Sequence, residues 1–173
     1  MERLHIRACA DIVAVSEPWT TLRETVEFSR YITRKEAYVC IHRWAGKSRA
    51  VGFIIFSPEP VFARGGYIRA IGVSPLLRRH CIGSSLLAYA EKKTARRASN
   101  IYLCVSSFNR QARAFYRNCG YAKVGTLVDL TSPGTVEYIY RKQIAAGSRK
   151  PCNGQSGSAI KRTGITKGTK SRP

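Results

Sequence analysis

One stretch of the chain, from Val73 to Lys93, limits the possible folds more than any other. Apolar and β-branched residues from Ile68 to Val73 are typical of a strand, and Pro75 prevents its ladder from continuing. From Ile82 to about Arg97, apolar residues recur at spacings of three and four, which predicts a helix with one buried face. The sequence therefore predicts a strand, a short loop and a helix in direct succession.

The loop inside this stretch is rich in positive charge. Arg78, Arg79 and His80 precede Gly83, which falls where the first helical amides have no acceptor within the helix. Free amides and the positive end of a helix dipole attract phosphate, and glycine lets a ligand approach the backbone closely. The loop is therefore a candidate anion site, although a basic loop by itself is also typical of a solvated surface.

A second motif, NRQARAFYRNCGY at residues 109–121, follows a predicted apolar strand. Together with VSPLLRRHCIGSSLL at residues 73–87, it resembles the two central motifs of the GNAT acetyltransferase superfamily. In that family a loop of the form Arg/Gln-x-x-Gly-x-Gly/Ala binds the pyrophosphate of acetyl-coenzyme A, and Cys81 stands here at the first glycine. A position that needs positive φ disfavours a side chain, so Cys81 is expected to affect cofactor affinity. The resemblance implies acetyl-coenzyme A as co-substrate, bound by Ile71, Val73, Arg78, Arg79, His80, Cys81, Ile82, Gly83, Ser84, Asn109 and Tyr116.

Acetyl transfer to an amine needs a neutral nucleophile, a polarised thioester and a proton for the departing thiolate. The resemblance implies that Tyr116 points at the thioester sulfur and that Asn109 holds the pantetheine arm. An alternative for Tyr116 is that it packs a short helix onto the sheet, as we expect for its neighbours Phe115 and Tyr121.

The general base is assigned less directly, because no carboxylate lies between Arg64 and Tyr89, where the family often has one. Glu137 is our candidate, with Glu17, Glu24 and a water relay as alternatives. Trp19 and Glu17 fall in the segment that covers the acceptor site in this fold, so we expect them on the substrate side.

The remaining patterns predict an α/β chain with a mixed, twisted sheet of about seven strands and helices on both faces, which is the GNAT fold. The strands are expected at 4–8, 38–41, 50–56, 68–73, 101–105, 121–130 and 136–143. Short helices are expected at 11–15, after a capping box of Thr21 and Glu24, and at 111–118 after an Asn109 cap. The strands at 68–73 and 101–105 are expected to splay apart around the cofactor, because the family's fold does so.

The chain divides by composition into a domain at 1–144 and a basic tail at 145–173. Of 173 residues, 30 are Lys or Arg and 10 are Asp or Glu, which gives a formal net charge of +20. The tail holds seven basic residues, no acidic residue and little that is apolar, so we expect it to be disordered. Such a charge favours anionic partners, and the tail is compatible with nucleic-acid binding.

Several classes of protein are disfavoured by the same composition. Six scattered cysteines without CxxC spacing and three isolated histidines predict neither a disulfide framework nor a metal site. No run is apolar enough for a signal peptide or a membrane span, so we expect a cytoplasmic protein with no membrane partner. The sequence leaves a monomer and a homodimer open.

Two functions agree with these patterns. The first is an N-acetyltransferase that moves the acetyl group of acetyl-coenzyme A to a primary amine on a small molecule, amino acid or protein N-terminus, by direct attack in a ternary complex. The alternative is a catalytically weak GNAT-fold module that binds nucleic acid or another anionic partner through its basic surface and tail.

Overall fold

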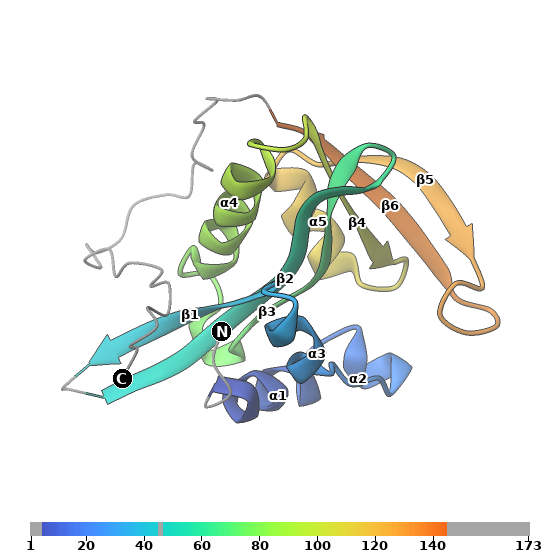
Figure 1. Cartoon of the computed structure of the whole chain (residues 1–173). Coiled ribbons are helices and arrows are strands. Elements are labelled where there is room, and N and C mark those ends of the chain that lie inside the picture. Colours follow the sequence, from blue (N-terminus) through green and yellow to red (C-terminus); the bar gives the residue numbers. More distant parts are fainter. Residues whose placement is uncertain (1–4, 45–46, 145–173) are drawn as a thin grey trace.

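The computed structural model describes residues 5–44 and 47–144 of the chain (Figure 1). Its centre is a six-stranded sheet with the order β1-β2-β3-β4-β6-β5, in which β3 and β4 are parallel and the other neighbours antiparallel. The elements follow one another as α1 (Ile6–Ala14), α2 (Trp19–Leu22), α3 (Phe28–Thr33), β1 (Ala37–Trp44), β2 (Lys47–Phe62), β3 (Gly65–Val73), a 3₁₀ turn (Pro75–Leu77), α4 (Ile82–Thr94), β4 (Asn100–Ser106), α5 (Arg110–Asn118), β5 (Ala122–Val128) and β6 (Val136–Gln143).

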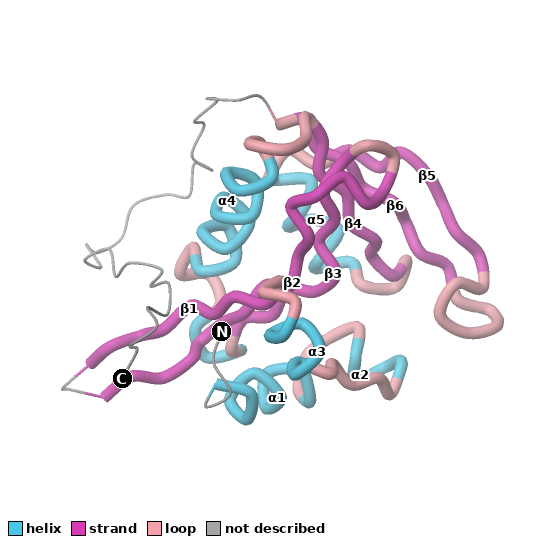
Figure 2. Tube along the Cα trace, in the orientation of Figure 1, coloured by secondary structure: helices cyan, strands magenta, loops and turns pink. Residues whose placement is uncertain are grey.

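Helices cover both faces of the sheet, as predicted (Figure 2). On one face α4 and α5 pack through Leu86, Leu87 and Tyr116 onto alternate residues of β4 such as Ile101 and Leu103. On the other face α1 and α3 bury a second cluster against β1 and β2, which consists of Cys9, Ile12, Val13, Phe28, Ala37, Ala50, Phe53 and Ile55. The mixed α/β architecture is therefore confirmed.

The two parallel strands at the centre of the sheet, β3 and β4, separate soon after they begin. Pairing joins Gly66 to Ile101, Tyr67 to Tyr102 and Ile68 to Leu103, and stops there. From residue 69 to Val73, β3 has no ladder partner on its β4 side, whereas β4 continues to Ser106 paired with β6. The predicted splay is present, and it exposes backbone groups of β3 along one edge.

The predicted first strand is wrong, and it explains why six strands are described rather than about seven. Residues 6–14 form α1, and residues 1–4 lie outside the described residues. Leu4, Ile6 and Ala8 alternate as in a strand, but Cys9, Ile12 and Val13 share one helical face, and all three are buried. Burial of that face against β2 outweighs the short alternation.

The predicted capping box is also wrong. Arg23 adopts a left-handed conformation with φ 53° and ends α2 at Leu22, and α3 begins only at Phe28. Thr21 therefore lies inside α2, where its hydroxyl donates to Glu17 at 2.9 Å. A local break in the backbone replaces the single helix that the spacing of Leu22, Val26 and Tyr31 indicated.

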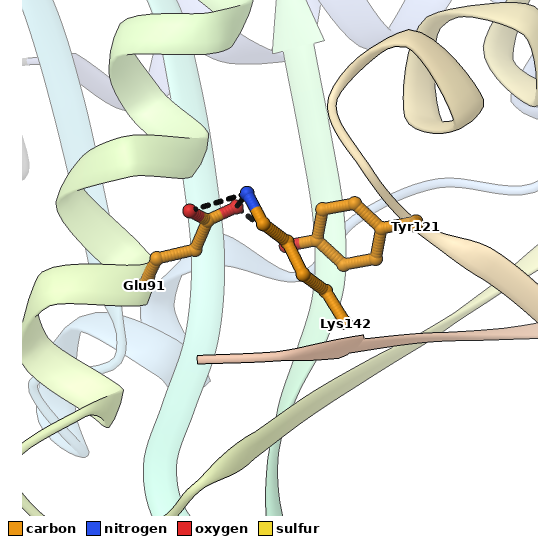
Figure 3. A network of polar contacts seen from close by, with 3 residues as sticks. All are labelled: Glu91, Tyr121 and Lys142. Atoms are coloured by element: carbon orange, nitrogen blue, oxygen red, sulfur yellow. Dashed lines mark hydrogen bonds and ion pairs between the residues drawn. The ribbon is translucent and has the colours of Figure 1, made fainter. Parts of the chain in front are cut away.

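One polar network ties α4 to β6 and to Tyr121, which precedes β5 (Figure 3). Lys142 Nζ on β6 lies 2.8 and 2.9 Å from the two carboxylate oxygens of Glu91 on α4, and the Tyr121 hydroxyl donates to the same carboxylate at 3.1 Å. The Glu91 and Lys142 side chains are only 17% and 26% exposed, so this ion pair is screened less than a surface pair.

The division of the chain into a domain and a tail stays a prediction, because residues 145–173 lie outside the described residues. No helix in the described part of the chain is long and apolar enough to cross a membrane.

Candidate functional site

The loop between β3 and α4 presents free backbone amides to solvent. Cys81 precedes α4 in a left-handed conformation with φ 58° and ψ 9°, and no side chain caps the helix. The first backbone bond that closes the helix runs from the Ser85 N–H to the Cys81 carbonyl oxygen at 2.9 Å. The amides of Ile82, Gly83 and Ser84 precede that bond, so they are free to meet an acceptor such as phosphate.

The basic side chains of the loop divide into two groups. Arg78 is held away from these amides, because its Nη2 donates to the Ser16 hydroxyl at 3.0 Å and its Nε lies 3.5 Å from the Val73 carbonyl oxygen. Arg79 and His80 are exposed, and the His80 Nδ1 lies 2.8 Å from the Arg78 carbonyl oxygen. Arg78 thus links the loop to the end of α1, whereas the charged group of Arg79 is exposed to solvent.

Gly83 is the point where α4, α5 and β3 meet. A Cβ added there would lie 3.1 Å from the Phe115 ring and 3.8 Å from a Val73 methyl group. Ile71, Val73, Ile82 and Phe115 are partly buried against the α4 core. An open strand edge, uncapped helical amides and an apolar floor are the features that a pantetheine arm and its pyrophosphate require, so these residues fit acetyl-coenzyme A.

The second motif forms α5 much as predicted. The Asn109 side-chain oxygen accepts from the Ala112 N–H at 3.0 Å and caps the helix. Tyr116 is 6% exposed, and its ring centroid lies 5.3 Å from Phe115 and 5.7 Å from Tyr121. Burial raises the pKa of the Tyr116 hydroxyl, with a smaller contribution from Cys119. The ring therefore packs the core, and the hydroxyl stays protonated at neutral pH.

Glu137 lies on β6, on the sheet face opposite α4. Strand β4 separates it from the gap between β3 and β4. Glu137 pairs with Ser106, whose neighbours Ile101, Leu103 and Val105 point toward α4, so Ser106 and Glu137 point away from it. Glu137 is 5% exposed and receives a hydrogen bond from Ser106, but its Oε1 has no partner in the described structure. Burial raises the Glu137 pKa, the Ser106 hydrogen bond opposes this, and the charge of Glu24 adds to it.

Two residues of the parallel strands complete this surface. The Tyr67 hydroxyl of β3 is hydrogen bonded to the Cys104 thiol of β4, at the start of the splay. Burial raises the pKa of both groups, and the charge of Glu137 adds to each. Tyr67, Cys104, Ser106 and Glu137 thus form one polar strip, which we call the Glu137 strip.

A cavity of about 260 Å³ lies beside the α2–α3 connection, on the face of the sheet opposite α4. Its walls include Trp19 and Arg30 from the helices, Glu24 from their connection, and Ile55 and Arg69 from the strands. Trp19 also contacts the core, since its ring centroid is 6.0 Å from Phe53. Because the charge of Glu24 acts on Glu137, this cavity and the Glu137 strip are electrostatic neighbours.

The remaining predicted substrate residue does not line this cavity. Glu17 is exposed, and hydrogen bonds from Thr20 and Thr21 lower its pKa. A larger cavity of about 560 Å³ lies at the other end of β3, between the β2–β3 turn and the residues after α4, and contains none of the predicted site residues. The roles predicted for individual residues from the sequence remain predictions.

Sequence reasoning missed Tyr67, Arg69, Cys104 and Ser106. The alternation in IYLCVSS places Cys104 and Ser106 on one face of a strand, which the sequence does reveal. The pairing of Ser106 with Glu137 depends on the register of β4 with β6, and no local pattern specifies that register.

Comparison with known proteins gives one family and many structures. Residues 5–121 match the profile of the acetyltransferase (GNAT) family. Among solved structures, the ribosomal-protein-S18-alanine N-acetyltransferase from Escherichia coli is 16% identical with a TM-score of 0.62, over 87% of this chain and 95% of the other. Ard1 from Thermoplasma volcanium is 19% identical with a TM-score of 0.63, over 84% and 95%. An aminoglycoside 6'-N-acetyltransferase complexed with coenzyme A is 18% identical with a TM-score of 0.62, over 86% and 95%. No curated protein sequence matches.

Proposed function

Because the chain belongs to the acetyltransferase (GNAT) family, we propose that it is an acetyl-coenzyme A-dependent N-acetyltransferase. The acceptor is a primary amine that attacks the thioester directly while both substrates are bound. The structural neighbours include enzymes named for protein and aminoglycoside acceptors, so the family alone leaves the acceptor open.

The buried carboxylate of Glu137 is the observation that carries this proposal. It is a nearly inaccessible acid with an unpartnered oxygen, on the sheet face that holds the cavity. A base for an ammonium group must be ionised yet basic enough to take a proton, and a raised pKa moves Glu137 toward that range. We assign to Glu137 the removal of one proton from the acceptor, directly or through one water.

Residues near α4 and the open edge of β3 bind acetyl-coenzyme A, and Tyr116 supplies the proton for the departing thiolate. Acetyl-coenzyme A provides the acetyl group and leaves as the free thiol. The amides of Ile82, Gly83 and Ser84 and the charge of Arg79 hold its pyrophosphate, and the unpaired edge of β3 holds the pantetheine amides. Tyr116, kept neutral by burial, holds a proton that the departing sulfur takes up.

The proposal is tested by calorimetric titration with acetyl-coenzyme A, followed by thiol-release assays with a panel of amines. Glu137→Gln is expected to lower kcat by about 10²- to 10⁴-fold, since a positioned base contributes that much. Glu59→Gln is the matched control, because it removes one carboxylate from an exposed ion pair with Arg97. Absence of cofactor binding, or equal kcat in parent and Glu137→Gln with a good acceptor, would contradict the proposal.

A further inference from the structure

The cavity beside the α2–α3 connection carries charges of both signs that are not paired with each other. Glu24 and Glu27 come from the α2–α3 connection, Arg30 from α3 and Arg69 from β3. Within the described residues, the ion pairs closer than 4.0 Å are Arg97–Glu59 and Lys142–Glu91, and neither lies in this cavity. All four charged side chains are exposed, so they are open to a ligand that carries both an ammonium and a carboxylate group.

Tyr67 is acted on by charges of both signs. The Arg69 guanidinium carbon lies 5.6 Å from the centre of the Tyr67 ring. The charges of Arg69 and Glu137 both act on the Tyr67 hydroxyl, which is hydrogen bonded to Cys104. Arg69 therefore lies over the Tyr67 ring, and Tyr67 shares one sheet face with Glu137, at the point where β3 and β4 begin to diverge.

The rest of the cavity wall suits the carbon skeleton of a small molecule. Trp19, Tyr31, Ile55 and Ala70 contribute aromatic and aliphatic surface between the charged groups. The volume of about 260 Å³ accommodates a molecule of amino-acid size. The Arg69 fork is stacked on Tyr67, so it presents a planar pair of donors suited to a carboxylate.

We propose that the acceptor is a free amino acid, whose ammonium group lies between Glu24 and Glu137 and whose carboxylate binds Arg69. This rests on the proposed function, because the amine placed next to Glu137 is the group that is acetylated. A peptide N-terminus offers an uncharged amide where an amino acid has its carboxylate, and it would leave Arg69 without a partner. Glu137 accepts one ammonium proton, and the amine nitrogen bonds to the acetyl carbon as the carbon–sulfur bond breaks. The thiolate takes its proton from Tyr116, and the second amine proton returns to Tyr116 through water.

The test compares three matched classes of acceptor with the full-length protein. The probes are the free L-amino acids, the corresponding amino-acid amides, and tripeptides that begin with the same residues. Thiol release measures kcat/KM, and calorimetric titration in the presence of coenzyme A measures binding without turnover. We expect at least one amino acid to exceed its own amide and tripeptide about 10- to 100-fold, as the loss of a charged hydrogen bond implies. Equal or better use of amides or tripeptides would overturn the assignment.

The variant Arg69→Gln tests the assigned partner, and Arg34→Gln is its control because Arg34 is exposed and does not line the cavity. Arg69→Gln is expected to lower kcat/KM of the amino acid about 10- to 100-fold and so to remove its preference over the amide, whereas Arg34→Gln should keep that preference. A preference that survives Arg69→Gln would overturn the role of Arg69. If the variant fails to fold, the comparison of acid and amide in the parent protein still decides the acceptor class. Acetylation of amines that lack a carboxylate, but not of amino acids, would refute this inference alone. Absence of thiol release with every amine would refute the proposed function as well.

Discussion

Replacement of Cys81 by glycine tests how the β3–α4 loop is built. Cys81 has φ 58° immediately before α4, in the left-handed region where a side chain costs about 1–2 kcal/mol. Glycine relieves that strain but adds about 0.4–1 kcal/mol of backbone entropy to the unfolded chain. The balance predicts a gain in unfolding free energy of roughly 0.5–1 kcal/mol, which corresponds to a rise in Tm of about 1–4 °C.

The effect on the cofactor follows from the same geometry. Cys81 is exposed and its carbonyl oxygen already accepts from the Ser85 N–H and the Ser84 hydroxyl, so the backbone is preformed. Cys81→Gly removes a side chain from the approach to the free amides, and calorimetric titration should give acetyl-coenzyme A affinity equal to the parent or higher.

Two controls separate backbone strain from side-chain chemistry. Cys81→Ala removes the thiol and keeps the Cβ, so its Tm should stay near the parent value. Arg79, with φ 68°, is strained in the same way, and Arg79→Gly should raise Tm while it weakens cofactor binding through the lost charge. A fall in Tm or clearly weaker binding for Cys81→Gly, with Cys81→Ala unchanged, would refute the reasoning from backbone conformation.

Three further predictions concern the two faces of the sheet. Tyr116→Phe keeps the ring that packs on Phe115 and Tyr121 and removes the hydroxyl, so kcat should fall about 10²-fold with acetyl-coenzyme A affinity unchanged; an unchanged single-turnover rate would exclude Tyr116 from the chemistry. Burial raises the Glu137 pKa, so kcat/KM should decline as the pH falls through that raised pKa, and Glu137→Gln should lose this acidic limb. Because folded Glu137 binds its proton more tightly than the unfolded chain does, ionisation lowers stability, and urea unfolding should show Glu137→Gln gaining on the parent as the pH rises above the ordinary glutamate pKa. Glu91→Gln removes the partner of the half-buried Lys142 and should lower the unfolding free energy by about 1–3 kcal/mol, and a loss below about 0.5 kcal/mol in urea unfolding would show that the network contributes little.

The sequence by itself determined the features that depend on neighbouring residues. The strand, loop and helix from Ile68 to Thr94 follow from hydrophobic periodicity and from one proline, and the Asn109 cap follows from side-chain chemistry within one turn. Strands β1 and β2 and the general mixed sheet follow from the same local patterns. Local patterns predicted the wrong element in α1, where a strand period and a helix period overlap. They also missed the end of α2, where the backbone of Arg23 is left-handed.

Only the tertiary structure decided which side chains meet. Arg78 lies in a loop that looks free to bind phosphate, yet its guanidinium is held by Ser16, 62 residues earlier in the chain. The register of β6 with β4 buries Glu137 beside Ser106 and leaves one of its oxygens without a partner. Tyr67 bonds Cys104 at the point where β3 and β4, paired for only three residues, begin to separate. Contacts of this kind depend on chain closure over long separations and on strand register, which burial across the whole sheet sets and no short stretch of residues encodes.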